Sequence, residues 1–115
     1  MRTIQLDDLI GYNKLVCDLS GEQSVVINED NLLSAIGVQF GYFESDELIA
    51  SALFRSLIVG HGFADGNKRT ATMCLLDIFP PIVSDSVIED VAIKIATGEL
   101  RNPEEIASKL YKIEE

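Results

Sequence analysis

Two apolar segments with helical spacing, separated by a short polar stretch, constrain the fold of this chain most strongly. Apolar side chains recur at intervals of three and four along residues 48–58 and again along residues 71–79. Gly60 ends the first segment, and Pro80 and Pro81 end the second. Each segment therefore predicts a helix that buries one face, and the apolar face of the first is broad enough for a central, largely buried helix.

Start and stop signals predict further helices at residues 6–19, 28–36, 86–98 and 103–112. Asn13 falls on the apolar face of the first of these. The capping signals are Asn28, Ser45, a capping box from Ser86 to Glu89, and Asn102 followed by Pro103. The chain has no repeat, linker or low-complexity tract. Residues 1–115 therefore predict a single all-α domain, a compact bundle of about six helices joined mostly by short loops.

Residues 37–43 interrupt the helical pattern. Two glycines and several alternating or adjacent apolar residues favour a short extended excursion or a hairpin there, and an ordinary connecting loop with its aromatic side chains turned inward is an equal alternative. The residues concerned are Gly37, Val38, Gln39, Phe40, Gly41, Tyr42 and Phe43. A second short extended piece is predicted at residues 25–27, within the loop that follows the first helix.

The charge balance limits the ligands that the chain can take. Nine basic residues face nineteen acidic ones, for a net charge of −10. A broad nucleic-acid surface is not expected, because it requires many lysines and arginines on one face. A small anionic ligand needs only a local cluster, and Lys68-Arg69 is the only pair of adjacent basic residues. The acidic remainder suits a solvated surface or a basic partner segment.

Cysteine usage and hydropathy favour a cytoplasmic protein. Cys17 and Cys74 are isolated among apolar residues, which predicts reduced, buried thiols, and with one histidine they offer no zinc-ligand spacing. No apolar run is long enough to span a membrane. Residues 1–8 lack the apolar centre of a signal peptide.

The polar stretch between the two apolar segments is suited to holding a phosphate. It ends where a helix is predicted to begin, and a helix N-terminus presents unpaired N–H groups and favours negative charge. Gly66 permits a tight turn, and Asn67 can cap the helix or bind a phosphate oxygen. Arg69 can bind phosphate oxygens with its fork of N–H groups, and Lys68 adds a mobile charge.

Three further residues of the stretch suit group transfer. His61, the only histidine, can accept a proton as a neutral imidazole. Asp65 offers a hard oxygen ligand for Mg²⁺, and Phe63 is predicted to point inward and anchor the loop. Each residue also has an ordinary structural interpretation as a helix cap, a turn or a solvated charge. Two cations at a helix N-terminus oppose the helix dipole, however, and this conflict favours an anion there.

The stretch as a whole resembles the signature loop of the Fic/Doc family, and most closely that of its Doc (death-on-curing) branch. The residues that carry the resemblance are His61-Gly-Phe63-Ala-Asp65-Gly66-Asn67-Lys68-Arg69-Thr70. The similarity extends to the helices on both sides and to residues 96–99, and it is weaker in the N-terminal third. It implies a compact helical fold and transfer of part of a nucleotide to a protein hydroxyl.

The resemblance also implies roles for single residues, with ATP as donor and Mg²⁺ as cofactor. It implies a general base at His61, a metal ligand at Asp65, an anion-binding turn at Gly66 and Asn67, a phosphate contact at Arg69 and a loop anchor at Phe63. Residues 37–43 would form the flap that holds the target segment by strand pairing.

Departures from the AMP-transferring Fic pattern favour the Doc branch. Lys68 stands where those enzymes usually have glycine, and Thr72 where they usually have a second arginine. In Doc proteins the nucleotide is thought to bind reversed, which brings the γ-phosphate to the target. Gly66 is Fic-like and leaves AMP transfer open. Gly62 replaces a frequent proline and adds freedom to the loop.

Three hypotheses follow. The first is a Doc-type toxin, a Mg²⁺–ATP-dependent kinase that acts on a Ser or Thr of a target protein, by resemblance a translation factor such as elongation factor Tu. No glutamate here is followed by Gly or Asn, as the self-inhibiting motif of the family requires, so a separate antitoxin is expected. The second hypothesis is AMP transfer (AMPylation) on the same fold. The third is a non-catalytic partner-binding member.

Overall fold

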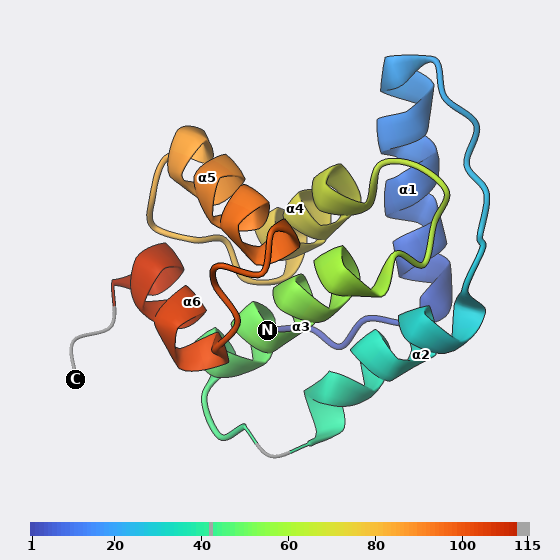
Figure 1. Ribbon diagram of the computed structural model, residues 1–115. Coiled ribbons are helices and arrows are strands. Elements are labelled where there is room, and N and C mark those ends of the chain that lie inside the picture. Colours follow the sequence, from blue (N-terminus) through green and yellow to red (C-terminus); the bar gives the residue numbers. More distant parts are fainter. Residues whose placement is uncertain (42, 113–115) are drawn as a thin grey trace.

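The computed structural model describes residues 1–41 and 43–112, and these form six α-helices and one short 3₁₀ helix, with no regular strand among them (Figure 1). This confirms the prediction of an all-α bundle of about six helices. In chain order the elements are α1 (Leu6–Ser20), α2 (Glu29–Gly37), η1 (Val38–Phe40), α3 (Asp46–Gly60), α4 (Asn67–Ile78), α5 (Asp85–Ala96) and α6 (Pro103–Tyr111).

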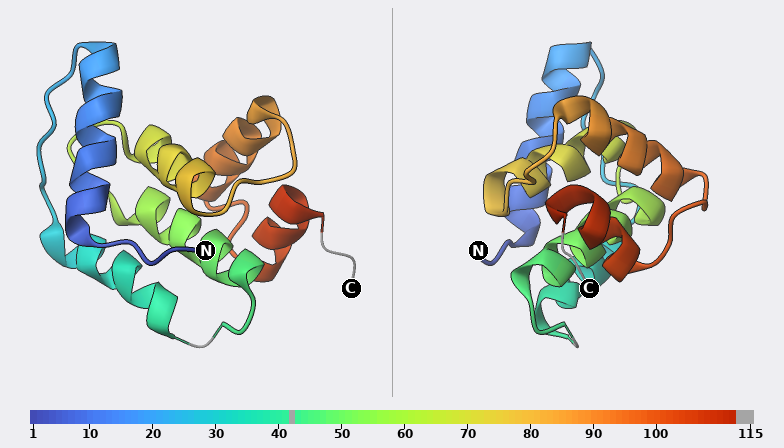
Figure 2. Two further views of the ribbon diagram at one scale, coloured as in Figure 1. Left: turned by 180° about the vertical axis from the view of Figure 1, so that it is seen from behind. Right: turned by 90° about the vertical axis from the view of Figure 1, so that its left-hand side faces the viewer.

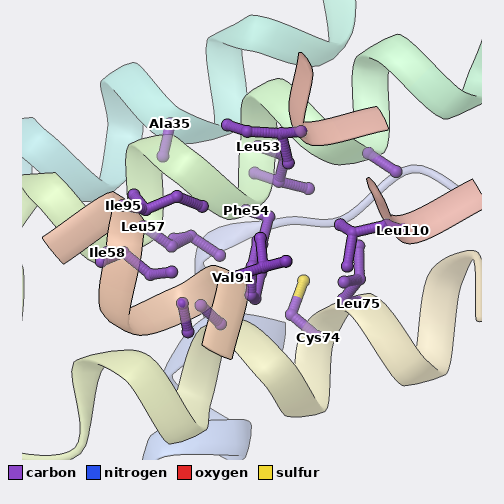
Figure 3. Close-up of a cluster of buried hydrophobic side chains, with 14 of the residues drawn as sticks. Ala35, Leu53, Phe54, Leu57, Ile58, Cys74, Leu75, Val91, Ile95 and Leu110 are labelled. Atoms are coloured by element: carbon purple, nitrogen blue, oxygen red, sulfur yellow. The ribbon is translucent and has the colours of Figure 1, made fainter. Parts of the chain in front are cut away.

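Helix α3 occupies the centre of the bundle, as its broad apolar face predicts. It packs against α2, α4, α5 and α6, and α1 crosses the end of α4 beside α2 (Figures 1 and 2). Phe54, Leu57 and Ile58 of α3 are at most 4% exposed and meet Val91 and Cys74 from the facing helices (Figure 3). Burial of each such side chain contributes about 1.5–3 kcal/mol, so α3 is a rigid base for the loop that follows it.

Side-chain caps fix the starts of several helices. Asn28, Ser45 and Asn102 accept hydrogen bonds from backbone N–H groups in the first turns of α2, α3 and α6, at 3.1, 3.2 and 2.8 Å. These three predicted caps are confirmed. Helix α1 begins with a capping box between Gln5 and Asp8, which the sequence analysis did not identify.

The predicted start of α5 is wrong by two residues, because the expected N-cap was Ser86 and the observed N-cap is Ser84. The helix begins at Asp85, and its N-cap is Ser84, whose backbone carbonyl accepts the N–H groups of Val87 and Ile88. The Ser86 hydroxyl lies 3.0 Å from the Ser84 hydroxyl, so it is occupied there and does not form the expected box. The extended backbone of Ser84 allows this earlier start.

Neither alternative given for residues 37–43 holds at residues 37–40, which are helical and not extended, and the Phe40 ring is 71% exposed and not turned inward. Helix α2 continues to Gly37 and passes directly into η1 (Val38–Phe40). The Gln39 side chain explains the compact path: it accepts the Ile4 N–H at 2.7 Å and donates to the Ile4 carbonyl at 3.0 Å. One side-chain amide thus takes the place of a strand partner and holds fully buried Ile4 in the core. Tyr42, assigned to the same excursion, lies outside the described residues.

Both cysteines are free and buried, as predicted. Burial raises the pKa of the Cys74 thiol to about 12 and also raises that of Cys17. No helix in the described part of the chain is long and apolar enough to cross a membrane.

Candidate functional site

The loop from His61 to Gly66 connects the end of α3 to the start of α4, and the segment before α2 runs beside it (Figure 1). Val26 and Phe63 form an isolated antiparallel bridge. The N–H groups of Ile27 and Asn28 both donate to the Gly62 carbonyl, at 2.9 and 3.1 Å. The extended piece predicted at residues 25–27 is found as a single bridge at Val26, with a bend at Ile27, and this segment supplies the backbone partner of the loop.

Gly62 is buried because the loop passes close to α2. A Cβ atom at this position would lie 2.2 and 2.5 Å from Cδ2 and Cγ of Leu32, which is 2% exposed. Its carbonyl is also held twice by the neighbouring segment. The glycine thus permits close packing at a fixed point of the loop, and a proline there would meet the same obstruction.

Phe63 and Asn67 close the loop on itself. The Phe63 ring is 2% exposed, inside the core. The Asn67 side-chain oxygen accepts the Phe63 N–H at 3.1 Å, and its NH₂ group donates to the Phe63 carbonyl at 2.8 Å. Both polar atoms of Asn67 thus shape the loop. The N-cap of α4 is Gly66, with a left-handed φ of 76°, and no side chain caps this helix.

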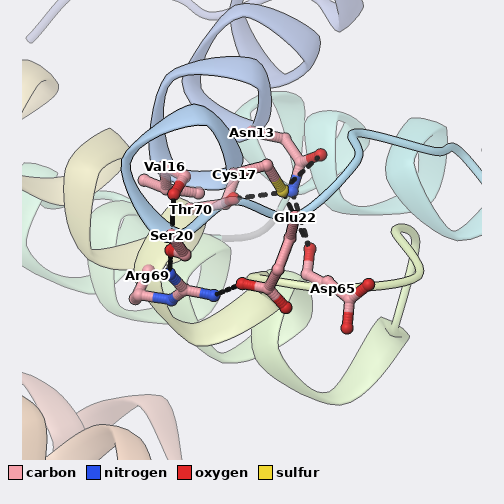
Figure 4. Close-up of polar contacts among 8 residues, drawn as sticks. All are labelled: Asn13, Val16, Cys17, Ser20, Glu22, Asp65, Arg69 and Thr70. Carbon is pink, nitrogen blue, oxygen red and sulfur yellow. Dashed lines mark hydrogen bonds and ion pairs between the residues drawn. The ribbon is translucent and has the colours of Figure 1, made fainter.

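Buried Asn13 of α1 joins the loop to α1 and α4 (Figure 4). Its NH₂ group donates to the Asp65 carbonyl at 2.8 Å and to the Thr70 hydroxyl at 3.1 Å. Its oxygen accepts from the Ser24 hydroxyl at 2.6 Å. Asn13 is predicted on the apolar face of its helix, with no role in the candidate site. A lone amide on an apolar face is the sequence signal for such a role, because a fully buried amide requires several polar partners.

Arg69 binds to the end of α1 and to the turn that follows it (Figure 4). Its Nη2 lies 2.5 Å from Oε1 of Glu22, and its Nη1 contacts the Ser20 hydroxyl and, at 3.5 Å, the Val16 carbonyl. The hydrogen bond from Arg69 is the main cause that lowers the pKa of Glu22. Because a cation is favourable at a helix C-terminus, the end of α1 relieves part of the dipole conflict predicted for α4.

His61, Asp65 and Lys68 are exposed, as is Arg69. His61 ends α3 with a left-handed φ of 45°, a conformation uncommon outside glycine. The Asp65 carboxylate points away from the carbonyl that Asn13 holds (Figure 4). No ion pair involves Lys68 within residues 1–41 and 43–112. The conflict with the dipole of α4 therefore persists at Lys68.

Asp65 is the one metal ligand that the sequence predicts, and its carboxylate is exposed. No group of three or more His, Cys, Asp or Glu side chains suitable for a metal occurs among the described residues. Mg²⁺ commonly binds one or two carboxylates and takes its other ligands from phosphates and water. A single exposed carboxylate could meet that requirement only together with phosphates supplied by a ligand, and it would not suit a zinc ion.

A groove of about 620 Å³ lies between the end of α1, the outer face of α4 and α5. Its apolar lining comes from Val16, Leu19, Met73, Leu76, Ala92 and Ile93, and its polar lining from Lys68, Arg69, Thr72, Asp85 and Glu89. The volume is typical of small-molecule sites. Two predicted phosphate ligands, Lys68 and Arg69, thus share one cavity, while His61 and Asp65 are not part of its lining.

No model of a known protein family matches the chain, and no curated protein matches it either.

Proposed function

We propose that this protein is a Doc-type toxin that transfers the γ-phosphate of ATP to a Ser or Thr hydroxyl of a target protein, such as elongation factor Tu, and that a separate antitoxin controls it. The observation that carries the proposal is the loop from His61 to Arg69, with its family resemblance, on a rigid turn that leads into a helix without a side-chain cap.

The start of α4 supports phosphate binding. The first backbone N–H groups of a helix have no partner within it, and no side chain supplies one at α4. Lys68 projects from this first turn into solvent, where it adds a positive charge. The adjoining groove, lined by both Lys68 and Arg69, has room for the nucleoside part of ATP.

His61 suits the role of general base in this reaction. The target hydroxyl attacks the γ-phosphorus, the bond from that phosphorus to the oxygen bridging the β- and γ-phosphates breaks, and ADP leaves. The neutral imidazole takes the hydroxyl proton. Mg²⁺, held by Asp65 together with the phosphates, would supply charge neutralisation. Lys68 and the first N–H groups of α4 stabilise negative charge that moves toward the leaving oxygen.

The target segment is better placed along residues 25–27 than along residues 37–43. Val25 and Ile27 use backbone groups to bind the loop, which directs the backbone groups of Val26 toward the other side. The side chains of Val25, Val26 and Ile27 are 42%, 39% and 62% exposed. An extended target peptide added to this edge would lie next to the loop that carries His61.

A labelling experiment tests the proposal. The chain is incubated with Mg²⁺, a bacterial translation extract and ATP labelled at either the α- or the γ-phosphate. We expect label from the γ-phosphate only, and its loss in His61→Asn. Asparagine tolerates the left-handed conformation of residue 61 and cannot act as a base, so this variant keeps the loop while it removes the proposed chemistry. Undiminished transfer by His61→Asn would refute the role of the imidazole.

Two alternatives are each favoured by one observation. Gly66 fits AMP transfer, which predicts label from the α-phosphate. The partners of Arg69 within the chain fit a non-catalytic partner-binding protein, because they satisfy that cation without a ligand. Such a protein would transfer neither label and would bind no Mg²⁺–ATP.

A further inference from the structure

We infer that Glu22 competes with phosphate for Arg69, so that the carboxylate of this chain occupies the arginine of the anion site until a ligand displaces it. The inference deepens the proposed function and rests on its assignment of Arg69 as a phosphate ligand. It assigns a regulatory role to the ion pair between Arg69 and Glu22, which lies in the turn after α1 and outside any self-inhibiting motif of the family.

The contacts within the chain engage both terminal nitrogens of Arg69, Nη1 and Nη2. A guanidinium binds phosphate best through two parallel N–H groups. Here Nη2 is 2.5 Å from the Glu22 carboxylate, while Nη1 is directed at the Ser20 hydroxyl and the Val16 carbonyl (Figure 4). A phosphate that binds end-on to Nη1 and Nη2 of Arg69 must therefore replace at least the carboxylate.

The carboxylate can leave while the backbone stays in place. The Glu22 N–H donates to the Cys17 carbonyl at 2.9 Å, and Gly21 adopts a left-handed φ of 72°, so the helix end fixes the turn. The Glu22 and Arg69 side chains are 33% and 48% exposed. Rotation of the Glu22 side chain into solvent is then sufficient, and an exposed ion pair of this kind is weak enough for a multiply charged anion to displace it.

Lys68 is placed to bind an incoming anion before Arg69 does. It projects from the first turn of α4 and forms no ion pair with the described residues, so it can meet an incoming anion first. Arg69 follows when Glu22 releases it. The opposite role for Glu22, in which it holds Arg69 ready for the ligand, predicts weaker anion binding when the carboxylate is removed, and this difference makes the inference testable.

The experiment is calorimetric titration of inorganic pyrophosphate into the wild-type chain and into Glu22→Gln, Glu22→Ala and Glu105→Gln. Glu105 lies on α6, away from the loop, and its substitution removes the same charge (Figure 1). Exposed ion pairs have strengths that correspond to affinity changes of up to about fivefold. We expect Glu22→Gln to bind pyrophosphate about two- to fivefold more tightly than Glu105→Gln, and Glu22→Ala at least as tightly as Glu22→Gln. The gain should disappear when Arg69→Gln is added.

The outcomes separate the two claims. Pyrophosphate binding by the wild-type chain without a gain in Glu22→Gln, or with a loss, overturns the competition and leaves the proposed function standing. A gain that persists in Arg69→Gln also overturns it, because the competition would then act elsewhere. Absence of binding in every variant overturns the inference together with the anion site of the proposed function.

Discussion

Replacing Gly62 with alanine should destabilise the protein through a clash with one side chain, Leu32. The added Cβ would lie 2.2 Å from Cδ2 and 2.5 Å from Cγ of this leucine, which is 2% exposed and cannot move aside freely. Overpacking in a core costs about 1–3 kcal/mol. Because φ of Gly62 is not left-handed, alanine also restricts the unfolded chain, which stabilises by about 0.4–1 kcal/mol. The expected net loss in the free energy of unfolding is about 0.5–2.5 kcal/mol.

A double-mutant cycle isolates the clash. Urea unfolding gives the free energy of unfolding for Gly62→Ala, Leu32→Ala and the double variant. Leu32→Ala alone should cost about 2–5 kcal/mol, and in its background Gly62→Ala should become neutral or stabilising. Gly11→Ala, inside α1 with no atom within 4 Å of its Cβ position, is the control and should stabilise by about 0.5–1 kcal/mol. An equal loss from Gly62→Ala in both backgrounds would show that the destabilisation has another cause.

Two more predictions concern polar contacts. Asn13→Ala removes hydrogen bonds from the Asp65 carbonyl, the Ser24 hydroxyl and the buried Thr70 hydroxyl, so urea unfolding should show a loss of about 2–3 kcal/mol. Exposed Asn31→Ala should lose about 0.5–1 kcal/mol, and similar losses in both variants would contradict the role of Asn13. The hydrogen bonds to Glu22 and Asp77, chiefly from Arg69 and Tyr12 respectively, lower the pKa values of these carboxyls below their ordinary values of 4.5 and 3.8. The stability that these two carboxylates contribute is therefore complete at a pH above the ordinary pKa values, and it is lost as the pH falls through the lowered ones. The urea midpoint of the wild type should exceed that of the Glu22→Gln, Asp77→Asn double variant at pH 6 and should approach it in acid. A difference in midpoint that stays constant with pH would contradict this linkage.

Local signals were enough to predict most of the fold. Asn28, Ser45 and Asn102 each act on N–H groups two or three residues away, so the pattern that identifies them lies within one helical turn. The apolar spacing of residues 48–58 likewise indicated the buried central helix. These features depend on neighbours in sequence, and a single sequence records such neighbours directly.

The errors and omissions occurred where the deciding partner is distant in sequence or unusual in kind. Gln39 bonds to the backbone of Ile4, which turned an expected extended segment into a 3₁₀ helix. The place of Gly62 in the packing depends on Leu32, and no pattern in the loop shows it. At α5 the N-cap residue Ser84 makes no side-chain capping bond, so the side-chain pattern at Ser86 indicated the wrong serine.

The N-terminal third, where the family resemblance is weakest, controls the shape and charge of the candidate site. Asn13 holds the backbone carbonyl of Asp65, and residues 25–27 pair with the loop. The turn after α1 supplies Glu22, which neutralises Arg69 and leaves Lys68 as the cation of the pair without a carboxylate partner among the described residues. The motif alone therefore indicates which groups are present. The segment before it determines which of them an anion meets first, so substitutions in α1 and its turn should change anion affinity while the motif stays intact.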